Sequence, residues 1–175
     1  MKSISQELIS RVIKKRKSAT HKGTYGRLLL IGGSKKYGGA LIMAAEGALN
    51  SGAGLVTVAT DQVNIAALHT RDPEIMALNW DESIELKNLI KSSDVVVCGM
   101  GLGLDDKAQQ ILRLLRDNIT LKQTLILDAS ALDLISQRND LLPLNSKILI
   151  FTPHQMEWER LSVIKISDQS DELNQ

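Results

Sequence analysis

The sequence predicts an α/β fold built around a mostly parallel sheet. Five apolar segments of strand length alternate with segments of helical periodicity, which is the pattern of parallel strands joined by helices. The first strand, over 28–31, has no polar alternation, as expected for a strand covered on both faces. The chain has 175 residues, 43% of them hydrophobic, and no linker-like segment, so we expect a single domain over 1–175.

Composition excludes several classes of protein. The formal net charge of +1 argues against electrostatic binding to nucleic acid or to a membrane surface. Cys98 is the only cysteine, which excludes an intrachain disulfide and a cysteine-based zinc site. No apolar run is long enough to span a bilayer. We therefore expect a cytoplasmic protein with no metal-ligating residues of its own and no nucleic-acid or membrane partner.

The stretch over 21–54 organises the rest of the chain. A strand over 28–31 opens into Gly32 and Gly33, and a helix of small residues follows over 40–50. Glycines after a strand allow a sharp turn and let a ligand approach the backbone, and a helix beginning there favours an anion. The alternative is an ordinary strand–turn–helix unit whose glycines only make the turn.

The remaining elements are predicted from periodicity and capping residues. The predicted strands cover 28–31, 55–60, 94–98, 124–127 and 147–151. The predicted helices cover 3–17, 40–50, 63–68, 82–91, 105–116 and 131–136. Ser3 with Gln6 forms a capping box for the first helix, and Asp105 or Asp106 caps the helix that follows it. An apolar segment over 75–78 follows a loop and is not counted as a strand.

Each suggestive motif follows a predicted strand directly. The motifs are GGS after the first strand, GMGLG after the third, DASAL after the fourth and TPH after the fifth. In parallel sheets, ligands bind beyond the carboxyl ends of the strands. This convergence predicts a ligand site at that edge of the sheet.

These motifs in this order resemble the NAD(P)H-hydrate dehydratase family. The resemblance is carried by KGTYG, IGGS, GGA, SGAGLVTVAT, GMGLG and TPHQME, and it extends over about 20–161. It implies a ribokinase-like three-layer sandwich with a mostly parallel sheet. It also implies ADP- or ATP-dependent dehydration of the S-epimer of hydrated NADH or NADPH, with Mg²⁺. The product is the repaired nicotinamide nucleotide.

The resemblance also implies substrate contacts. They fall on Ala40 in GGA, on Gly101 and Gly103 in GMGLG, and on His154 in TPH. Met100 stands where the family has a proline, which removes some rigidity from that turn.

Three further residues are possible supports of the site. Asp128 follows an apolar strand as a candidate carboxylate, and the alternative is that it caps the helix that comes next. Pro153 is expected to open a helix in its first turn, so that His154 and Glu157 share one face. Lys22 matches the family's lead-in, where it could lie near phosphate.

The later part of the family's catalytic domain has no counterpart here. A lysine-containing phosphate loop and a GTGD motif, whose aspartate is the expected base, are not found after Leu161. We therefore expect the N-terminal part of the enzyme, incomplete at the C-terminal side, with an unknown catalytic residue and impaired activity. An uncovered sheet edge would make the isolated chain marginal, partly molten or a homo-oligomer, or would pair it with a separately encoded C-terminal half.

Two other functions stay open at this point. One is a vitamin or sugar kinase of the same fold, against which TPH and the KGTYG lead-in argue. The other is a non-catalytic remnant that binds a dinucleotide.

Overall fold

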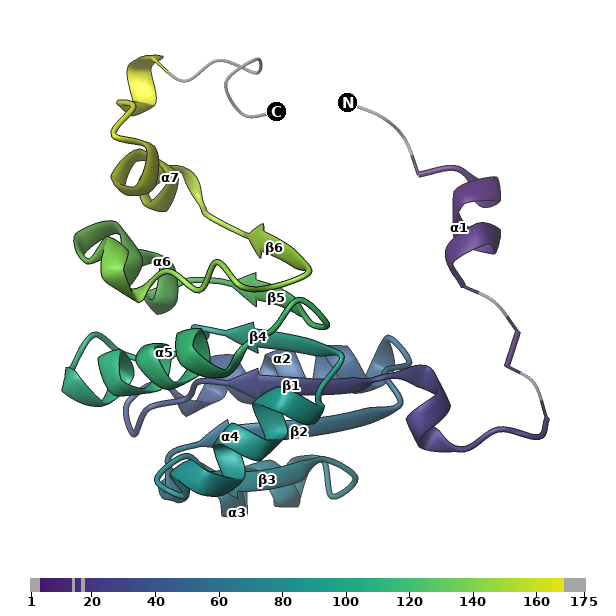
Figure 1. The fold of residues 1–175 in the computed structure, drawn as a ribbon. Coiled ribbons are helices and arrows are strands. Elements are labelled where there is room, and N and C mark those ends of the chain that lie inside the picture. Colours follow the sequence, from purple (N-terminus) through teal and green to yellow (C-terminus); the bar gives the residue numbers. More distant parts are fainter. Residues whose placement is uncertain (1–3, 14, 17, 169–175) are drawn as a thin grey trace.

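The computed structural model describes residues 4–13, 15–16 and 18–168 and confirms the α/β class. Its centre is a parallel sheet of six strands in the order β3-β2-β1-β4-β5-β6 (Figure 1). The strands are β1 (Arg27–Ile31), β2 (Leu55–Thr60), β3 (Met76–Asn79), β4 (Val95–Cys98), β5 (Thr124–Leu127) and β6 (Ile148–Phe151). The prediction missed β3, which is short and forms one edge of the sheet.

Seven α-helices and three short 3₁₀ turns lie among the described residues. The helices are α1 (Gln6–Val12), α2 (Gly38–Asn50), α3 (Gln62–Arg71), α4 (Ser83–Ser92), α5 (Asp106–Asn118), α6 (Ser130–Gln137) and α7 (Gln155–Ser162). The 3₁₀ turns are η1 (Lys22–Tyr25), η2 (Asn139–Leu141) and η3 (Ile166–Asp168). None of these helices is long and apolar enough to cross a membrane.

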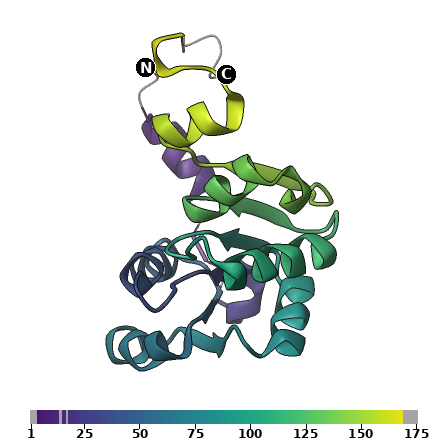
Figure 2. The ribbon, with the colours of Figure 1, turned by 90° about the vertical axis from the view of Figure 1, so that its left-hand side faces the viewer.

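The helices form a layer on each face of the sheet (Figure 2). Helix α2 packs on the face formed by Leu30, Val56 and Val58, where Leu41 and Ala45 of the helix are fully buried. Helices α4, α5 and α6 cover the opposite face and form the larger core. The result is the three-layer sandwich that the family resemblance implied.

Strand β1 is the point at which the chain changes direction across the sheet. It pairs with β2 on one side and with β4 on the other, both in parallel. The chain therefore builds β2 and β3 outward in one direction and β4, β5 and β6 in the other. A parallel sheet leaves a crevice at such a reversal, beyond the carboxyl ends of its strands.

Helix α5 shows why the sequence pattern was informative. The Asp105 carboxylate accepts a hydrogen bond from the Ala108 amide at 3.0 Å, so Asp105 is the N-cap. One side of the helix is buried in the core, and its members are Ala108, Ile111, Leu112 and Leu115. This apolar side faces the sheet because the spacing of its residues matches the helical repeat.

The first helix is shorter than predicted. Helix α1 covers only Gln6–Val12, and its cap is Ser5, whose hydroxyl accepts a hydrogen bond from the Leu8 amide at 3.2 Å. Ser3, the predicted cap, lies outside the described residues. Helix α1 buries no residue and stands away from the sheet (Figure 1), so no packing extends it. After α1, the Arg16 guanidinium lies 4.3 Å from the centre of the Tyr25 ring, and this contact joins the N-terminal segment to η1.

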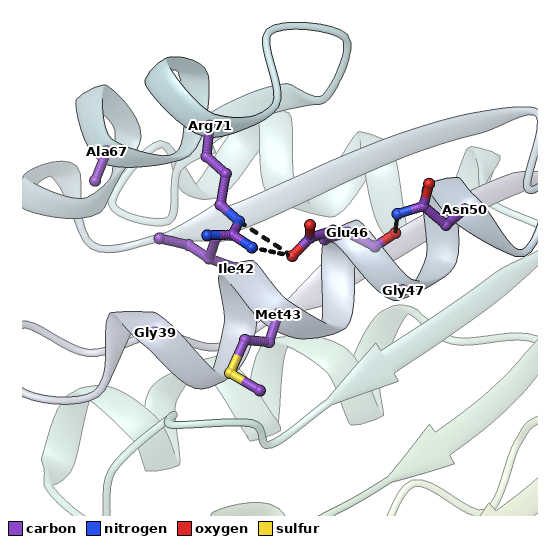
Figure 3. A pocket seen from close by; sticks show the side chains of 8 residues that line it. All are labelled: Gly39, Ile42, Met43, Glu46, Gly47, Asn50, Ala67 and Arg71. Carbon is purple, nitrogen blue, oxygen red and sulfur yellow. Dashed lines mark hydrogen bonds and ion pairs between the residues drawn. The ribbon is translucent and has the colours of Figure 1, made fainter.

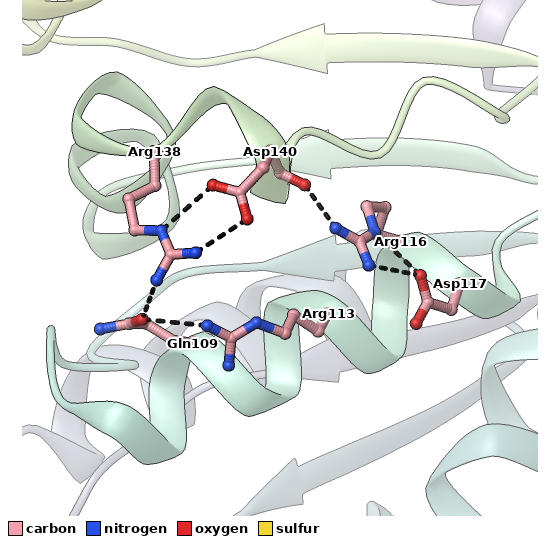
Figure 4. A network of polar contacts seen from close by, with 6 residues as sticks. All are labelled: Gln109, Arg113, Arg116, Asp117, Arg138 and Asp140. Carbon is pink, nitrogen blue, oxygen red and sulfur yellow. Dashed lines mark hydrogen bonds and ion pairs between the residues drawn. The ribbon is translucent and has the colours of Figure 1, made fainter.

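A polar network joins helix α5 to η2 (Figure 4). The Arg138 guanidinium donates to the Asp140 carboxylate at 2.9 Å and to the Gln109 side-chain oxygen at 3.0 Å. Arg116 donates to the Asp140 carbonyl oxygen at 2.5 Å. The Arg138 hydrogen bond lowers the pKa of Asp140 and raises that of Arg138. The network orients η2, but its exposure to water limits its effect on stability.

Candidate functional site

A hollow of about 670 Å³ lies at the carboxyl edge of the sheet. The loops and helix starts that follow β1, β2, β3, β4 and β5 all contribute to its wall. The lining residues are Ser34, Lys35, Lys36, Tyr37, Asp61, Trp80, Asp81, Gly103, Leu104, Asp105, Lys107, Ser130 and Asp133. The predicted convergence of motifs at strand ends is therefore confirmed for those after the first, third and fourth predicted strands.

Backbone hydrogen bonds fix the loops that follow β1 and β4 against each other. The Gly33 amide donates to the Met100 carbonyl at 2.9 Å, and the Ser34 amide donates to the Gly101 carbonyl at 2.6 Å. Gly101 has a φ of +62°, and a Cβ there would lie 2.2 Å from the Tyr37 carbonyl oxygen. Glycine is required at this position because the two loops approach too closely for a side chain.

The loop after β1 is also held from β2. The Gly33 carbonyl accepts hydrogen bonds from the Thr60 hydroxyl at 2.8 Å and from the Asn64 side-chain amide at 2.6 Å. Thr60 is fully buried. Sequence reasoning did not single out Thr60 or Asn64, although their positions at the end of a strand and the start of a helix were a usable signal.

Of the predicted substrate contacts Gly103 and Ala40, only Gly103 lines the hollow. Gly103 lines it, and its amide donates to the Ser130 hydroxyl at 3.3 Å. Ala40 lies in the first turn of α2, exposed but outside the lining set. Their contacts with substrate stay predictions.

Asp128 does not cap helix α6. The N-cap of α6 is Ala129, which has a φ of +47° and makes no side-chain capping bond. The Asp128 carboxylate instead accepts a hydrogen bond from the Thr152 hydroxyl at 2.7 Å. The register pairs Leu127 with Phe151, so the next residues of the two strands are brought side by side. Asp128 therefore connects the ends of β5 and β6.

His154 and Glu157 form a capping box at the start of α7. The Nδ1 atom of His154 accepts hydrogen bonds from the Met156 and Glu157 amides at 3.1 and 3.3 Å. The Glu157 carboxylate accepts one from the His154 amide at 2.9 Å. The cap is His154, so Pro153 lies before the helix and does not open its first turn as predicted. The shared face of His154 and Glu157 is confirmed.

This capping box decides which ring nitrogen of His154 can meet a ligand. Nδ1 is an acceptor in the cap, so the neutral ring holds its proton on Nε2. That atom lies 3.4 Å from a carboxylate oxygen of Glu157, whose side chain is only 8% exposed, whereas the His154 side chain is 62% exposed. His154 is thus an exposed hydrogen-bond donor held in place by a buried carboxylate.

Five of the seven charged side chains that line the hollow are held by other groups. Lys107 pairs with Asp81, and Asp133 with Arg160. Asp61 and Asp105 are the N-caps of α3 and α5. Within the described residues, Lys35 and Lys36 make no ion pair and lie exposed on the loop after β1. The rim after β1 is therefore positive. Sequence reasoning named neither lysine as a site residue.

Lys22 lies apart from these groups. It opens η1, which precedes β1, and so it lies at the amino end of that strand. The hollow is at the other end. No group of three or more His, Cys, Asp or Glu side chains that could hold a metal occurs among the residues described. Cys98 is fully buried, and burial raises the pKa of its thiol to about 12.

A second hollow of about 730 Å³ lies between helices α2 and α3 (Figure 3). The Arg71 guanidinium reaches across it to the Glu46 carboxylate, with an N–O distance of 2.7 Å. Asn50 donates to the Glu46 carbonyl oxygen at 3.0 Å. These contacts give each polar side chain that lines this hollow a partner, and the strand ends do not line it. The carboxyl-edge hollow is therefore the better candidate site.

The fold and the carboxyl-edge hollow define a parallel α/β protein whose candidate ligand site lies where its strand order reverses. Comparison with known proteins gives the family. A sequence model of the NAD(P)H-hydrate dehydratase family matches residues 28–175. An ADP-dependent (S)-NAD(P)H-hydrate dehydratase of Lactiplantibacillus plantarum is 48% identical over 99% of this chain and 62% of its own length. An enzyme of the same name from Enterococcus faecalis is 46% identical over 100% of this chain and 60% of its own length.

Solved structures agree with these matches. A ribokinase-like superfamily protein from Enterococcus faecalis has a TM-score of 0.93 at 44% identity, covering 98% of this chain and 60% of its own. An ADP/ATP-dependent NAD(P)H-hydrate dehydratase from Bacillus subtilis, co-crystallised with ATP/Mg²⁺, has a TM-score of 0.75 at 27% identity. It covers 94% of this chain and 57% of its own.

The chain belongs to the NAD(P)H-hydrate dehydratase family. Its ribokinase-like fold, expected from the sequence, is confirmed. It spans about three fifths of the length of the curated relatives described above, at 62% and 60%.

Proposed function

We propose that this chain supplies the substrate-binding part of an ADP- or ATP-dependent (S)-NAD(P)H-hydrate dehydratase. The observation that supports this most directly is the carboxyl-edge hollow, formed at the strand reversal by motifs typical of the family. The substrate is the S-epimer of hydrated NADH or NADPH, and the product is the repaired nucleotide.

The positive rim supports binding of a dinucleotide. Hydrated NADH and NADPH contain a pyrophosphate, and Lys35 and Lys36 offer two cations at the hollow that pair with no acidic side chain in the described part of the chain. Tyr37 is 61% exposed beside them and offers an aromatic ring for stacking. His154 adds a hydrogen-bond donor through Nε2. Ala40, Gly101 and Gly103 are proposed to let the substrate approach the backbone.

The reaction needs more groups than the hollow provides. Hydroxide is a poor leaving group, so the hydroxyl has to be phosphorylated by ADP or ATP before it departs. That step needs a base, a nucleotide clamp and neutralised phosphate charge. The described residues offer no three-ligand cluster for Mg²⁺. We therefore assign no residue of this chain to Mg²⁺ or to the catalytic base.

The test combines binding and turnover. Calorimetry with hydrated NADPH is expected to show binding by the purified chain, weakened about tenfold when Lys35 and Lys36 are both replaced by alanine, or about 1.4 kcal/mol. Lys122→Ala, an exposed lysine on another loop, is the matched control and is expected to bind normally. Equal affinity in all three proteins would refute the site.

Turnover separates the enzyme from its non-catalytic alternative. A coupled assay follows NADH recovered from hydrated NADH in the presence of ADP or ATP and Mg²⁺. Recovery that depends on the nucleotide supports the dehydratase function for this chain. Binding without recovery supports a dinucleotide-binding protein that needs further groups for catalysis.

A further inference from the structure

One side chain outside the carboxyl-edge hollow contacts both ends of the loop that carries Lys35 and Lys36. The loop consists of residues 34–37, between Gly33, which follows β1, and Gly38, the first residue of α2. All four loop residues line the hollow. Asn64, in the first turn of α3, reaches both of the flanking glycines.

The nitrogen of the Asn64 side-chain amide holds the first flanking glycine. Nδ2 donates a hydrogen bond to the Gly33 carbonyl at 2.6 Å and another to the Thr60 hydroxyl oxygen at 3.0 Å. The Thr60 hydroxyl donates in turn to the Gly33 carbonyl at 2.8 Å, and the Asp61 amide adds a donor at 3.2 Å. These donors use the full acceptor capacity of the carbonyl. They therefore fix the orientation of the peptide that joins Gly33 to Ser34.

The other atoms of the Asn64 amide lie against the glycine at the far end of the loop. A Cβ at Gly38 would lie 2.1 Å from Oδ1 of Asn64 and 2.6 Å from its Cγ. Gly38 is buried, so the amide packs directly on its backbone. The start of α2 can approach α3 this closely only because Gly38 has no side chain.

The short loop carries this restraint to the two lysines. The Tyr37 amide donates to the Ser34 carbonyl at 2.9 Å, which closes residues 34–37 into a tight turn. Lys35 and Lys36 are the two central residues of this turn. A lysine side chain is flexible, so the region that its charge can reach is set by the backbone that carries it. The ends of the turn therefore decide where the two charges lie.

We infer that Asn64 is a positioning residue for phosphate binding, which acts through the loop over residues 34–37. It fixes both ends of the loop and so keeps Lys35 and Lys36 at the hollow, where the pyrophosphate of hydrated NADH or NADPH binds in the proposed function. Thr60 supports it as the second side-chain donor to Gly33. The inference rests on the proposed function and deepens it, because it names residues outside the hollow that set its affinity.

Calorimetry with hydrated NADPH tests this inference on the full chain. Asn64→Ala is expected to weaken binding about fivefold, because the loop loses a contact at each end. Asn50→Ala is the matched control, since Asn50 donates to a carbonyl oxygen within its own helix, α2, and does not line the carboxyl-edge hollow. This control is expected to bind as the parent chain does.

A double-mutant cycle distinguishes positioning of the lysines from a general effect. In a chain with Lys35 and Lys36 both replaced by alanine, Asn64→Ala is expected to change the affinity by less than about twofold. The reason is that the loop has then lost the charges that Asn64 positions. An equal loss with and without the lysines would mean that Asn64 acts by another route.

Thr60 offers a second pair of variants. Thr60→Val removes the other side-chain donor to the Gly33 carbonyl with little change in shape, and it is expected to weaken binding about threefold. Thr60→Ser keeps the hydroxyl and is expected to bind as the parent chain does. If Thr60 only filled space, Thr60→Ser would be the more damaging change, because serine lacks the methyl group.

Trypsin gives a readout of the loop that needs no substrate. It cleaves after lysine, and Lys35 and Lys36 are exposed in the loop. Cleavage after these lysines, followed by mass spectrometry, is expected to be at least about threefold faster in Asn64→Ala than in the parent chain or in Asn50→Ala. Cleavage after Lys122, exposed on another loop, is the internal reference. Thermal melts verify that each variant is folded.

The outcomes separate this inference from the proposed function. Parent-like affinity of Asn64→Ala, an equal loss in both lysine backgrounds, or unchanged cleavage by trypsin would overturn the inference alone. A parent chain that does not bind hydrated NADPH would instead count against the proposed function. The trypsin comparison would then still decide whether Asn64 holds the loop.

Discussion

Replacing Gly101 by alanine tests the contact between the loops that follow β1 and β4. Gly101 has a φ of +62°, and its added Cβ would lie 2.2 Å from the Tyr37 carbonyl oxygen and 2.9 Å from the Tyr37 Cβ. An ordinary contact is about 3.5 Å, so one loop has to move by about 1.3 Å. The movement is resisted by the hydrogen bond from the Ser34 amide to the Gly101 carbonyl, at 2.6 Å.

The expected cost is the sum of two effects. A left-handed backbone costs a residue with a side chain about 1–2 kcal/mol, and a lost or weakened hydrogen bond costs about 1 kcal/mol. We therefore expect Gly101→Ala to lower the free energy of unfolding by about 2–3 kcal/mol. For a chain of this size, that corresponds to a fall in Tm of about 4–12 °C.

Gly47→Ala is the matched control for this experiment. Gly47 lies in the interior of α2, and a Cβ there would meet no heavy atom within 4 Å. Alanine is the better helix former, so this variant is expected to gain about 0.5–1 kcal/mol. Thermal melting by circular dichroism compares the two variants. Shifts in the same direction, or a Gly101→Ala melting temperature equal to that of the parent chain, would refute the loop-contact argument.

Other predictions follow from the capping box, the buried thiol and the core. His154→Ala is expected to lose about 1 kcal/mol of stability because the helix cap is removed, whereas His154→Asn keeps the cap. Both variants should bind hydrated NADPH more weakly. Urea melts measure the capping role and calorimetry measures the role in binding. Because burial raises the pKa of Cys98 to about 12, the folded thiol keeps its proton where the unfolded thiol ionises. The free energy of unfolding should therefore fall as pH rises from about 9 towards 12, and fall less in Cys98→Ala. Urea melts at about pH 8 and about pH 10.5 measure this fall, and an equal fall in the two proteins would contradict the argument. Leu112→Ala in the core should cost about 2–5 kcal/mol, and Leu121→Ala, 68% exposed, should cost under about 0.5 kcal/mol in the same urea melts.

The parallel core was predictable because its strands have a simple pattern. Segments such as Leu55–Thr60 and Thr124–Leu127 are rich in apolar residues, with threonine as their only polar residue type, and their bounds were predicted correctly. Strand β3 was missed because its sequence, MALN, is short and lies at an edge, where pairing with β2 decides the structure. Helix α1 was predicted too long because its periodicity continues, but no core stabilises the extra turns.

The site was predictable only in outline. Strand ends indicated where the motifs converge, but side-chain partners depend on register. Asp128 was predicted as a candidate site carboxylate, with helix capping as the alternative. It contacts Thr152 because β5 and β6 pair in a register that cannot be derived from either segment alone. The pairing of Asp133 with Arg160 likewise joins α6 to α7, which are distant in sequence.

The residues on either side of strand β6 affect how readily this segment aggregates. The strand reads ILIF, with high β propensity and no charge, and such segments stack readily into cross-β assemblies when their edge is free. Lys147 precedes it and Pro153 follows two residues after it. A charge and a proline at the ends of such a segment act as gatekeepers, because they oppose the stacking of identical strands. Lys147 and Pro153 are therefore expected to oppose cross-β stacking of this segment in chains that have not yet folded.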